Sequence, residues 1–470
     1  MSIFTKTNTA SRRDLIVNGS ISKAILMLST PTMLMGIIQS MIPVIDGLFI
    51  NNVVGTAAAS AITYCTPIIM LMTALAQGLS VAGTAMIGQM NGRSDFSGGK
   101  KVATQIFVAT FIIGCLFAPI LAGLSFPISN MTSSDISHNV FLYLILYSVI
   151  QPFSFLEFVY NAIKNANGKP EAPFIRMIIL LILKVLFNFV FIVLLDWQII
   201  GSVAATFFAN ILVCGWMYIE LFISKNDDRL TLKNFHFDKR VIIQMFRIGI
   251  PAMLSTCMLN LGFFLINNET AKYGAVTLNG QGIANNITAI CFTLPASFGT
   301  SVTTIVSMNV GAGNGARAKK GCIVGCIISA ISAALLIAII VPLSPYLTIL
   351  FTRQPDVLDV ANKALHIYTY SVIGFGVCMV ELGAFIGLGR TFVPMVVNIL
   401  RVCVIRIIFI FFTEKYLGVY SVFWGNLVSN YLSAIISTVL LMRVPWVSTI
   451  KNSFVKNDEL KGTKKSLPEN

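Results

Sequence analysis

The sequence is poor in charged residues and contains only three histidines. Just 11% of its 470 residues are Asp, Glu, Lys or Arg, whereas soluble globular chains carry about 25%. The hydrophobic share is 56% and the mean hydropathy is +0.82. Because a water-soluble fold must cover itself with polar groups, this composition excludes an ordinary soluble domain and indicates an integral membrane protein.

The sequence also lacks the motifs of nucleotide-driven and enzymatic chemistry. No G-x-x-x-x-G-K-[ST] phosphate loop occurs, so the Gly-rich segment 88–101 is interpreted as a turn and ATP is not the expected energy source. The three histidines are scattered, and no Ser/His/Asp or metal-ligand spacing stands out. We therefore expect neither an enzyme nor a chain that carries a cofactor or a metal site.

The nine cysteines all lie within or beside apolar stretches, and their number is odd. No disulfide framework is therefore implied. Cys322 and Cys326 are one helical turn apart, which suits a metal ligand pair by spacing alone. Because no further His or Cys lies nearby in the sequence, packing is the expected role of both.

Long apolar stretches favour membrane helices over a barrel, whose strands would alternate with a period of two. At about 20 residues per helix, the pattern predicts an all-α integral membrane protein with about twelve spans. The expected spans are roughly 22–50, 58–88, 102–126, 138–163, 173–195, 198–223, 243–267, 277–305, 322–343, 363–388, 393–414 and 418–442.

The excess of basic residues is placed unevenly along the chain. Lys and Arg number 33 against 19 Asp and Glu, and most lie in the N-terminus, the even-numbered connections and the C-terminal tail. The odd-numbered connections hold only Lys272, Arg353, Lys363 and Lys415. By the positive-inside bias, both termini are expected to be cytoplasmic, in a multi-pass protein of the cell membrane. The charge is thus a topology signal, and we expect no nucleic-acid partner.

Much of the pattern of residues 31–101 returns at 251–320. Both copies open with proline after a basic stretch and end in glycine followed by basic residues. A second match is the turn G-[KR]-x-x-x-P, which occurs at Gly168 and again at Gly389. Each half holds about six spans, and an even number returns the chain to the same side. We therefore predict two parallel six-helix bundles related by a pseudo-two-fold axis along the membrane normal.

The repeat also predicts the domain boundaries. The linker between the halves is the longest and most basic cytoplasmic connection, and contact with anionic lipid headgroups would explain its charge. The expected parts are a cytoplasmic N-terminal segment (1–20), an N-terminal bundle (21–223), a cytoplasmic linker (224–242), a C-terminal bundle (243–443) and a basic cytoplasmic tail (444–470).

One carboxylate, Asp46, interrupts the first apolar span and has no counterpart in the second copy. A charge near mid-membrane costs about 2.5–3.5 kcal/mol on insertion scales, so such residues face the protein interior or a wet cavity. Asp46 follows Pro43, and a proline inside a helix frees a carbonyl and kinks the chain. We interpret Asp46 as an ion-coupling site and Pro43 as a hinge. The alternative is a structural Asp bonded to amides such as Asn51 or Gln39.

Two further acids lie within spans. Glu157 in the fourth span and Glu381 in the tenth are candidates for the substrate cavity, although their positions relative to Gly168 and Gly389 do not align. The alternative for each is a carboxyl bonded to a helix neighbour or to a buried Arg. Two arginines of the eleventh span lie deep enough to need partners, and these acids are conceivable ones; the arginines are Arg401 and Arg406.

Amides are the remaining polar candidates. Asn260 lies in the seventh span and Gln281 in the eighth, and amides inside membrane helices bind one another or line a wet path. Together with Gln39 of the first span, they complete the set of candidate cavity residues.

Several segments resemble the MATE family of multidrug and toxic-compound extruders. They are VIDGLFINNVVGTAAASA with IGQMNGRSD, the repeated G-[KR]-x-x-x-P turn, and IGIPAMLSTC with SMNVGAGNGARAK. The resemblance covers nearly all of residues 15–445. It implies a V-shaped pair of six-helix bundles and cation-driven export of amphipathic, often cationic small molecules. The implied coupling ion is H⁺ or Na⁺; no other cofactor is expected, the partners are substrates and membrane lipids, and we expect a monomer.

The resemblance transfers only in part to individual residues. Asp46 falls where many members have an acid in the first helix. Many members carry Asn and, four residues later, Asp in the fifth helix; here Asn188 is followed by Ile192. The acid that some members place in the seventh helix is replaced by Leu259 and Asn260. Asp46 with Asn188 as its polar partner is therefore the predicted ion site. A lone carboxylate suits H⁺, whereas Na⁺ needs several oxygen ligands.

The function expected from the sequence is a secondary active efflux transporter that exports amphipathic, cationic compounds by antiport with H⁺ or Na⁺ through alternating access. The alternative is a lipid-linked saccharide flippase of related fold. Such a protein would line its cavity with several cations to meet a pyrophosphate. The deep candidates here are few, namely Lys184, Arg401 and Arg406.

Overall fold

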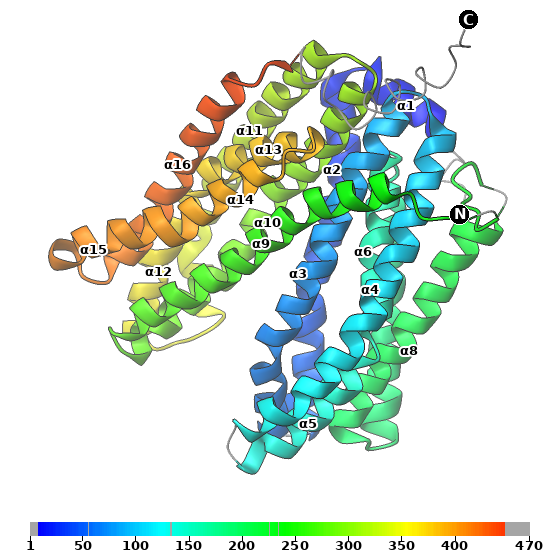
Figure 1. Cartoon of the computed structure of the whole chain (residues 1–470). Coiled ribbons are helices and arrows are strands. Elements are labelled where there is room, and N and C mark those ends of the chain that lie inside the picture. Colours follow the sequence, from blue (N-terminus) through cyan, green and yellow to red (C-terminus); the bar gives the residue numbers. More distant parts are fainter. Residues whose placement is uncertain (1–7, 55, 132–133, 225, 234, 447–470) are drawn as a thin grey trace, which may run out of the picture. The chain divides into compact units, whose positions relative to one another are not determined.

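A computed structural model describes residues 8–446 apart from 55, 132–133, 225 and 234, and this part of the chain contains helices and no strand (Figure 1). The first repeat is built from α1 (Thr9–Val17), α2 (Ile21–Phe49), η1 (Ile50–Val54), α3 (Thr56–Gly92), α4 (Phe96–Asn130), α5 (Ser134–Ser148), α6 (Gln151–Ala166), α7 (Glu171–Asn188), η2 (Phe189–Leu194), α8 (Gln198–Tyr218) and η3 (Ile219–Ile223). The second is built from α9 (Lys239–Ala271), α10 (Ala275–Gly311), α11 (Gly315–Ile349), α12 (Pro355–Tyr370), α13 (Val372–Gly387), α14 (Phe392–Ile399), η4 (Leu400–Ile405), α15 (Arg406–Leu417) and α16 (Tyr420–Met442).

The number of membrane spans agrees with the sequence. In the described residues, 10 helices are long and apolar enough to cross a membrane, and the total is up to 12 when each of two bent helix pairs is taken as one span. The prediction of an all-α integral membrane protein with about twelve spans is thus confirmed. Most of the basic tail predicted at 444–470 lies outside the described residues.

The fourth and tenth spans are not continuous helices. The pair α5–α6 bends by 52° and the pair α12–α13 by 42°. At each break a serine hydroxyl bonds the carbonyl three residues earlier, Ser148 to Ile145 at 2.6 Å and Ser371 to Tyr368 at 2.7 Å. Such bonds compete with the backbone ladder and bend helices. Pro152 adds to the first bend, because it has no amide hydrogen to donate.

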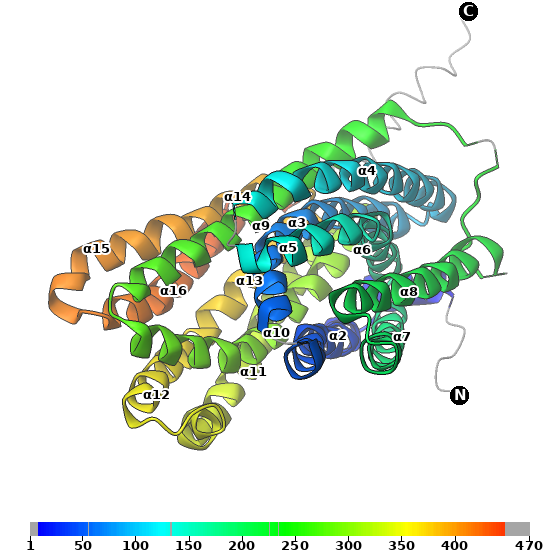
Figure 2. The same cartoon turned by 90° about the horizontal axis from the view of Figure 1, so that it is seen from below.

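The chain divides into two compact units. Unit 1 comprises residues 1–12, 34–87 and 95–253, and unit 2 comprises 13–33, 88–94 and 254–470. Within unit 1, α4 packs against α5 and α6, and α7 packs against α8. Within unit 2, α10 packs against α11, α12 and α13, and α13 packs against α16 (Figures 1 and 2). Because α2, α3 and α9 contribute to both units, the bundle boundaries at 21–223 and 243–443 stay a prediction.

The two sequence repeats form the same local structures. The helices α3 and α10 are both 37 residues long, and α4 and α11 are both 35. The helix α4 is capped by Asp95, whose side chain accepts from the Gly98 amide at 2.8 Å, and Asn314 caps α11 in the same way. Gly168 and Gly389 have φ angles of 71° and 74°. This left-handed region favours glycine, which explains why the turn motif begins with it in both copies.

Candidate functional site

Asp46 is held by two side chains from one face of α7. Its Oδ2 atom lies 2.5 Å from the Lys184 ammonium, and its Oδ1 atom accepts from the Asn188 amide at 2.9 Å. Lys184 and Asn188 are four residues apart, which places them on the same helix face. All three residues belong to unit 1, so this cluster links α2 to α7 inside a single unit.

The cluster is partly desolvated. The Asp46 side chain is 23% exposed and that of Lys184 is 11% exposed, while Asn188 is fully buried. Pairing the two charges lowers the cost of holding either of them within a membrane span. Asn188 is the last α-helical residue before the π-helical turn η2, and such turns are frequent at functional sites. The arrangement can exchange a cation at the carboxylate, because another cation can compete with the Lys184 ammonium.

The sequence paired Asp46 with Asn188 but did not pair it with Lys184. The available signal was the four-residue spacing of Lys184 and Asn188 within the otherwise apolar stretch 177–191. Gln39 is an exposed residue of α2, and Pro43 lies within the same helix. The side chains of Pro43 and Asn51 lie outside the described residues.

Glu157 forms an ion pair with a buried arginine. Its Oε2 atom on α6 lies 2.7 Å from the Arg176 guanidinium on α7, and the Arg176 side chain is 1% exposed. The sequence raised a buried Arg as the alternative partner for this acid, and the structure supplies one. The conceivable pairing of Glu157 with Arg401 or Arg406 is not what the structure shows.

Glu381 is bonded to a neutral partner. This residue of α13 is 3% exposed, and its Oε1 atom accepts from the Thr438 hydroxyl of α16 at 2.5 Å. Its Oε2 atom is buried without a hydrogen-bond partner in the described part of the chain. The conceivable pairing of Glu381 with Arg401 or Arg406 does not match this geometry.

The two deep arginines of unit 2 contact amides. The guanidinium of Arg401 donates to Asn430 at 3.3 Å and to Asn398 at 3.1 Å, and that of Arg406 donates to Asn426 at 3.4 Å. Both arginines are about one-twentieth exposed. Arg401 is the second residue of the π-helical turn η4, and Arg406 is the first residue of α15, which follows that turn.

The predicted amide candidates lie apart from the Asp46 cluster. Gln281 of α10 is 1% exposed and lies beside Tyr368, which in turn lies close to Arg406. Asn260 is half-buried on α9. Both belong to unit 2, whereas Asp46 belongs to unit 1.

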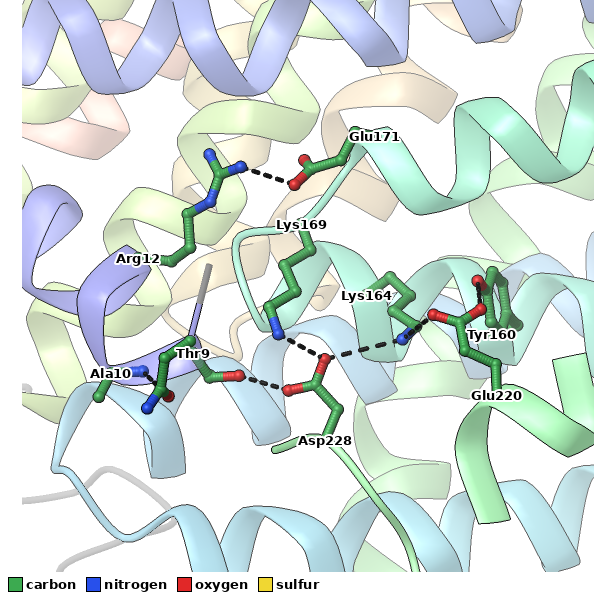
Figure 3. A network of polar contacts seen from close by, with 10 residues as sticks. Thr9, Ala10, Arg12, Tyr160, Lys164, Lys169, Glu171, Glu220 and Asp228 are labelled. Carbon is green, nitrogen blue, oxygen red and sulfur yellow. Dashed lines mark hydrogen bonds and ion pairs between the residues drawn. The ribbon is translucent and has the colours of Figure 1, made fainter. Parts of the chain in front are cut away.

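A charge network that the sequence did not predict joins the linker to three other segments of unit 1 (Figure 3). Asp228, in the linker, lies 2.8 Å from Lys169 and 3.7 Å from Lys164, and it accepts a hydrogen bond from Thr9 of α1. Lys164 also pairs with Glu220 at 2.6 Å. Burial opposes the ionisation of Asp228, but the two ammoniums and the hydrogen bonds outweigh it and hold the pKa of this carboxyl below its ordinary value.

A second ion pair fastens α1 to the start of α7. The Arg12 guanidinium lies 2.6 Å from Glu171, as Figure 3 shows. The predicted linker is therefore more than a basic surface for lipid contact. The signal that sequence reasoning missed was Asp228, an acid in a mostly basic segment that also contains Asp227 and Asp238.

Among the residues that the structure describes, no group of three or more His, Cys, Asp or Glu side chains could hold a metal ion. Cys322 lies in an apolar cluster of unit 2 with Ile305 and Val380. That position agrees with a packing role.

The helical repeat and the buried polar groups can be compared with known proteins. The MatE family profile matches residues 31–190 and 251–412, one match in each repeat. The chain belongs to the MATE family. It is therefore a multi-pass membrane transporter and not an enzyme, and the predicted duplication coincides with the two matched segments.

Related MATE proteins and structures cover most of the chain. The chain is 21% identical to the probable multidrug resistance protein YoeA of Bacillus subtilis, over 82% of this chain and 85% of that protein. It is 21% identical to the multidrug export protein MepA of Staphylococcus haemolyticus, over 90% and 93%. A crystal structure of MATE in the straight conformation superposes with a TM-score of 0.87 at 20% identity, covering 93% of this chain and 99% of that one. At this identity the structural likeness shows the fold.

Proposed function

We propose that this MATE protein is a secondary active efflux transporter that exports amphipathic cations by antiport with H⁺ or Na⁺ through alternating access. Its relatives YoeA and MepA are named for multidrug resistance and export, which supports the substrate class. The positive-inside bias supports cytoplasmic termini.

The observation that carries the proposal is the contact of Asp46 with Lys184 and Asn188. It is a partly exposed ion pair that joins two membrane helices, in a chain whose other described intramembrane acids have different partners. Because the carboxylate already has a cationic partner, a coupling cation binds only by competing with the Lys184 ammonium. Binding therefore has to alter the contact between α2 and α7.

The coupling step follows from this competition. A proton or Na⁺ that reaches Asp46 neutralises the carboxylate and releases Lys184. Loss of the ion pair frees α2 to move relative to α7, and Pro43 is the proposed hinge within α2. When the ion leaves, the pair forms again and restores the starting state. The other candidate residues, Gln39, Glu157, Asn260, Gln281 and Glu381, are proposed to contribute to substrate contacts.

The test is transport by purified protein in liposomes. Efflux of a fluorescent lipophilic cation would be followed with a pH gradient alone and with a Na⁺ gradient alone. We expect Asp46→Asn to abolish gradient-driven export, because the amide cannot exchange a cation. Lys184→Met should still bind the dye. Its export of the dye should depend less on the ion gradient than export by the wild type does.

The control is Asp359→Asn, which removes an exposed acid that pairs with Lys363 on the surface of α12. Export by this variant should equal that of the wild type. Full gradient-dependent export by Asp46→Asn, at normal expression and folding, would show that the ion site lies elsewhere.

The second candidate function is that of a lipid-linked saccharide flippase of related fold. The observation that favours it is the pair of buried arginines in unit 2, Arg401 and Arg406, because such a substrate carries a pyrophosphate. No export of the dye under either gradient, together with gradient-dependent movement of an anionic lipid, would select this function.

A further inference from the structure

The buried cations of the two units have different kinds of partner. In unit 1, Arg176, Lys184 and Lys164 each lie within 2.7 Å of a carboxylate oxygen. In unit 2, Arg401 and Arg406 are 5% and 4% exposed, and the contacts recorded for them are with amides, an aromatic ring and a tyrosine. Because a buried charge without a counter-charge is strongly unfavourable, this pair is the unexplained electrostatic feature of the molecule.

The backbone brings the two guanidiniums to one side of the helix. Residues five apart in an α-helix point about 140° apart around the axis. In a π-helix the bonding is from i to i+5, so residues five apart point in more nearly the same direction. The turn η4 covers Leu400–Ile405 and therefore brings the side chains of Arg401 and Arg406 toward the same side of the helix. Consistent with this, their partners Asn430 and Asn426 are one turn apart on α16 and bonded to each other at 3.2 Å.

Two donors in this cluster are unused. The Nε atoms of both arginines are buried without a hydrogen-bond partner in the described residues, and the Tyr368 hydroxyl lies beside Arg406 and Gln281. The neighbouring contacts are long or weakly polar, since Arg401 lies over the ring of Phe375 at 5.1 Å. Two guanidiniums with unused donors favour a ligand that carries negative charge and accepts hydrogen bonds.

The repeat explains why the counter-charge is missing. Asp46 lies 15 residues after Pro31 in the first copy, and the residue 15 after Pro251 is Ile266. Lys184 lies 16 residues after Gly168, and Arg406 lies 17 after Gly389. The second copy thus keeps a cation close to the position of Lys184 and has an aliphatic residue where the first copy has its acid.

We propose that Arg401 and Arg406, beside Tyr368, form a binding site for an oxyanion in unit 2. The planar guanidinium fork binds carboxylate and similar oxyanions through paired hydrogen bonds, which an ammonium cannot do. The oxyanion comes either from the carboxylate of an amphipathic solute or from a small free anion. The first source rests on the proposed transport function, and the second does not.

The first experiment measures binding at equilibrium, so its result does not depend on transport. The full-length protein in detergent would be titrated with acetate and with inorganic phosphate at constant ionic strength, and its thermal unfolding followed. We expect a saturable stabilisation by acetate in the wild type and its loss in Arg401→Gln/Arg406→Gln. Lys415→Gln, an exposed cation on the same helix α15, should respond as the wild type does.

The second experiment distinguishes the sources. A fluorescent amphiphile with a free carboxylate would be compared with its methyl ester by fluorescence polarisation. If the carboxylate of a solute is the ligand, the free acid should bind the wild type roughly tenfold more tightly than the ester, and the arginine variants should bind the two equally. Saturable acetate or phosphate binding without this preference would identify a small free anion.

The outcomes that overturn the proposal are equally direct. Equal anion responses in the wild type and the double variant, or no saturable response together with equal binding of the two dyes, would exclude the site. If the double variant does not fold, Arg406→Lys provides the test, because it keeps the charge but loses the planar fork. Its anion affinity should fall, and an unchanged affinity would contradict the assignment.

Discussion

At the scale of residues, the described buried cations fall into two groups. Arg176 has a carboxylate partner at 2.7 Å, whereas Arg401 has amides and a ring. Removing one partner of a buried ion pair leaves the other charge uncompensated. Removing a buried cation that has no counter-charge instead removes the desolvation cost of that cation. The same chemical substitution should therefore have opposite effects at the two positions.

The first prediction compares these arginines. Arg176→Gln should destabilise the protein by up to roughly 3–5 kcal/mol, because Glu157, whose side chain is only 13% exposed, is left charged without its partner. Arg401→Gln in a buffer without binding anions should be neutral or stabilising. Thermal unfolding in detergent measures both effects. The double variant Arg176→Gln/Glu157→Gln should recover much of the loss, and a loss as large as that of the single variant would disprove the pairing argument.

The second prediction concerns Asp228 in the linker. Its pKa is held below the ordinary value of 3.8, so its ionised form stabilises the fold at any pH above that value. This contribution disappears as the pH falls through the lowered pKa. Asp228→Asn should therefore be less stable than the wild type at pH 7, and the two should converge only in strongly acidic solution.

Unfolding midpoints of the wild type and Asp228→Asn, measured across a range of pH, would test this predicted pH dependence of stability. A difference between the two proteins that vanished already near neutral pH would mean that the Lys164 and Lys169 contacts do not hold the charge in solution. Thr9→Ala removes only the hydrogen bond that Asp228 accepts, so its smaller effect should follow the same pH dependence.

At the scale of elements, the repeated glycines at the ends of α3 and α10 have a common physical reason. A Cβ atom on Gly92 would overlap the carbonyl of Met308, and one on Gly311 would overlap the carbonyl of Gln89. The contact is reciprocal, and all four residues belong to unit 2. Each copy of the repeat therefore ends in glycine because the two backbones approach closely there.

The third prediction follows from this contact. Gly311→Ala should lower the unfolding midpoint clearly, because the added methyl group forces the two backbones apart. Gly215→Ala on α8 is the matched control, since its Cβ would meet nothing within 4 Å. Gly215→Ala should be neutral or slightly stabilising. Equal stability of the two variants would refute the close approach.

The sequence predicted the helices well and their interruptions poorly. Apolar length and basic flanks located every described span, because both reflect the membrane itself, but the predicted ends differ from the observed ones by as much as eight residues, at Pro355. The bends at Ser148 and Ser371 were missed. They depend on a hydroxyl bond to one carbonyl, and a serine inside an apolar helix makes such a bond in some contexts and not in others.

At the scale of the whole molecule, the duplication and the MATE fold could be predicted from the sequence, but most side-chain pairs could not. Asp46 was recognised as costly within lipid, and Asn188 was proposed as its partner through family resemblance. The spacing of Lys184 and Asn188 places both on one face of α7, but whether that face meets Asp46 depends on how α2 faces α7, which is set by packing. The same holds for Glu157 and Arg176, because their partnership is set by helix rotation and packing.

The fourth prediction concerns topology. With cytoplasmic termini, the linker at 226–233 lies in the cytoplasm and the connection at Lys272 lies outside. A protease site placed after Asn226 should be cut only when the cytoplasmic face is exposed, and one placed after Lys272 should be cut in intact cells. Cleavage in the linker would disturb the Asp228 contacts, but it should not change the side of the membrane on which the cleavage site lies. The reverse pattern of cutting would contradict the predicted cytoplasmic location of the termini and the linker.

The division of the chain into units has a consequence for how the protein is made. Residues 13–33 and 88–94 are synthesised with the first repeat but pack in unit 2, where Arg317 donates to the carbonyl of Ile16 at 3.3–3.4 Å and Gln89 donates to that of Gly387 at 3.1 Å. These early segments can therefore make their final contacts only after their partners, which follow more than two hundred residues later in the chain, have been synthesised. Until then, residues 13–33 and 88–94 of the nascent first repeat lack their packing partners. The linker keeps the first repeat covalently attached to the second repeat, which supplies those partners.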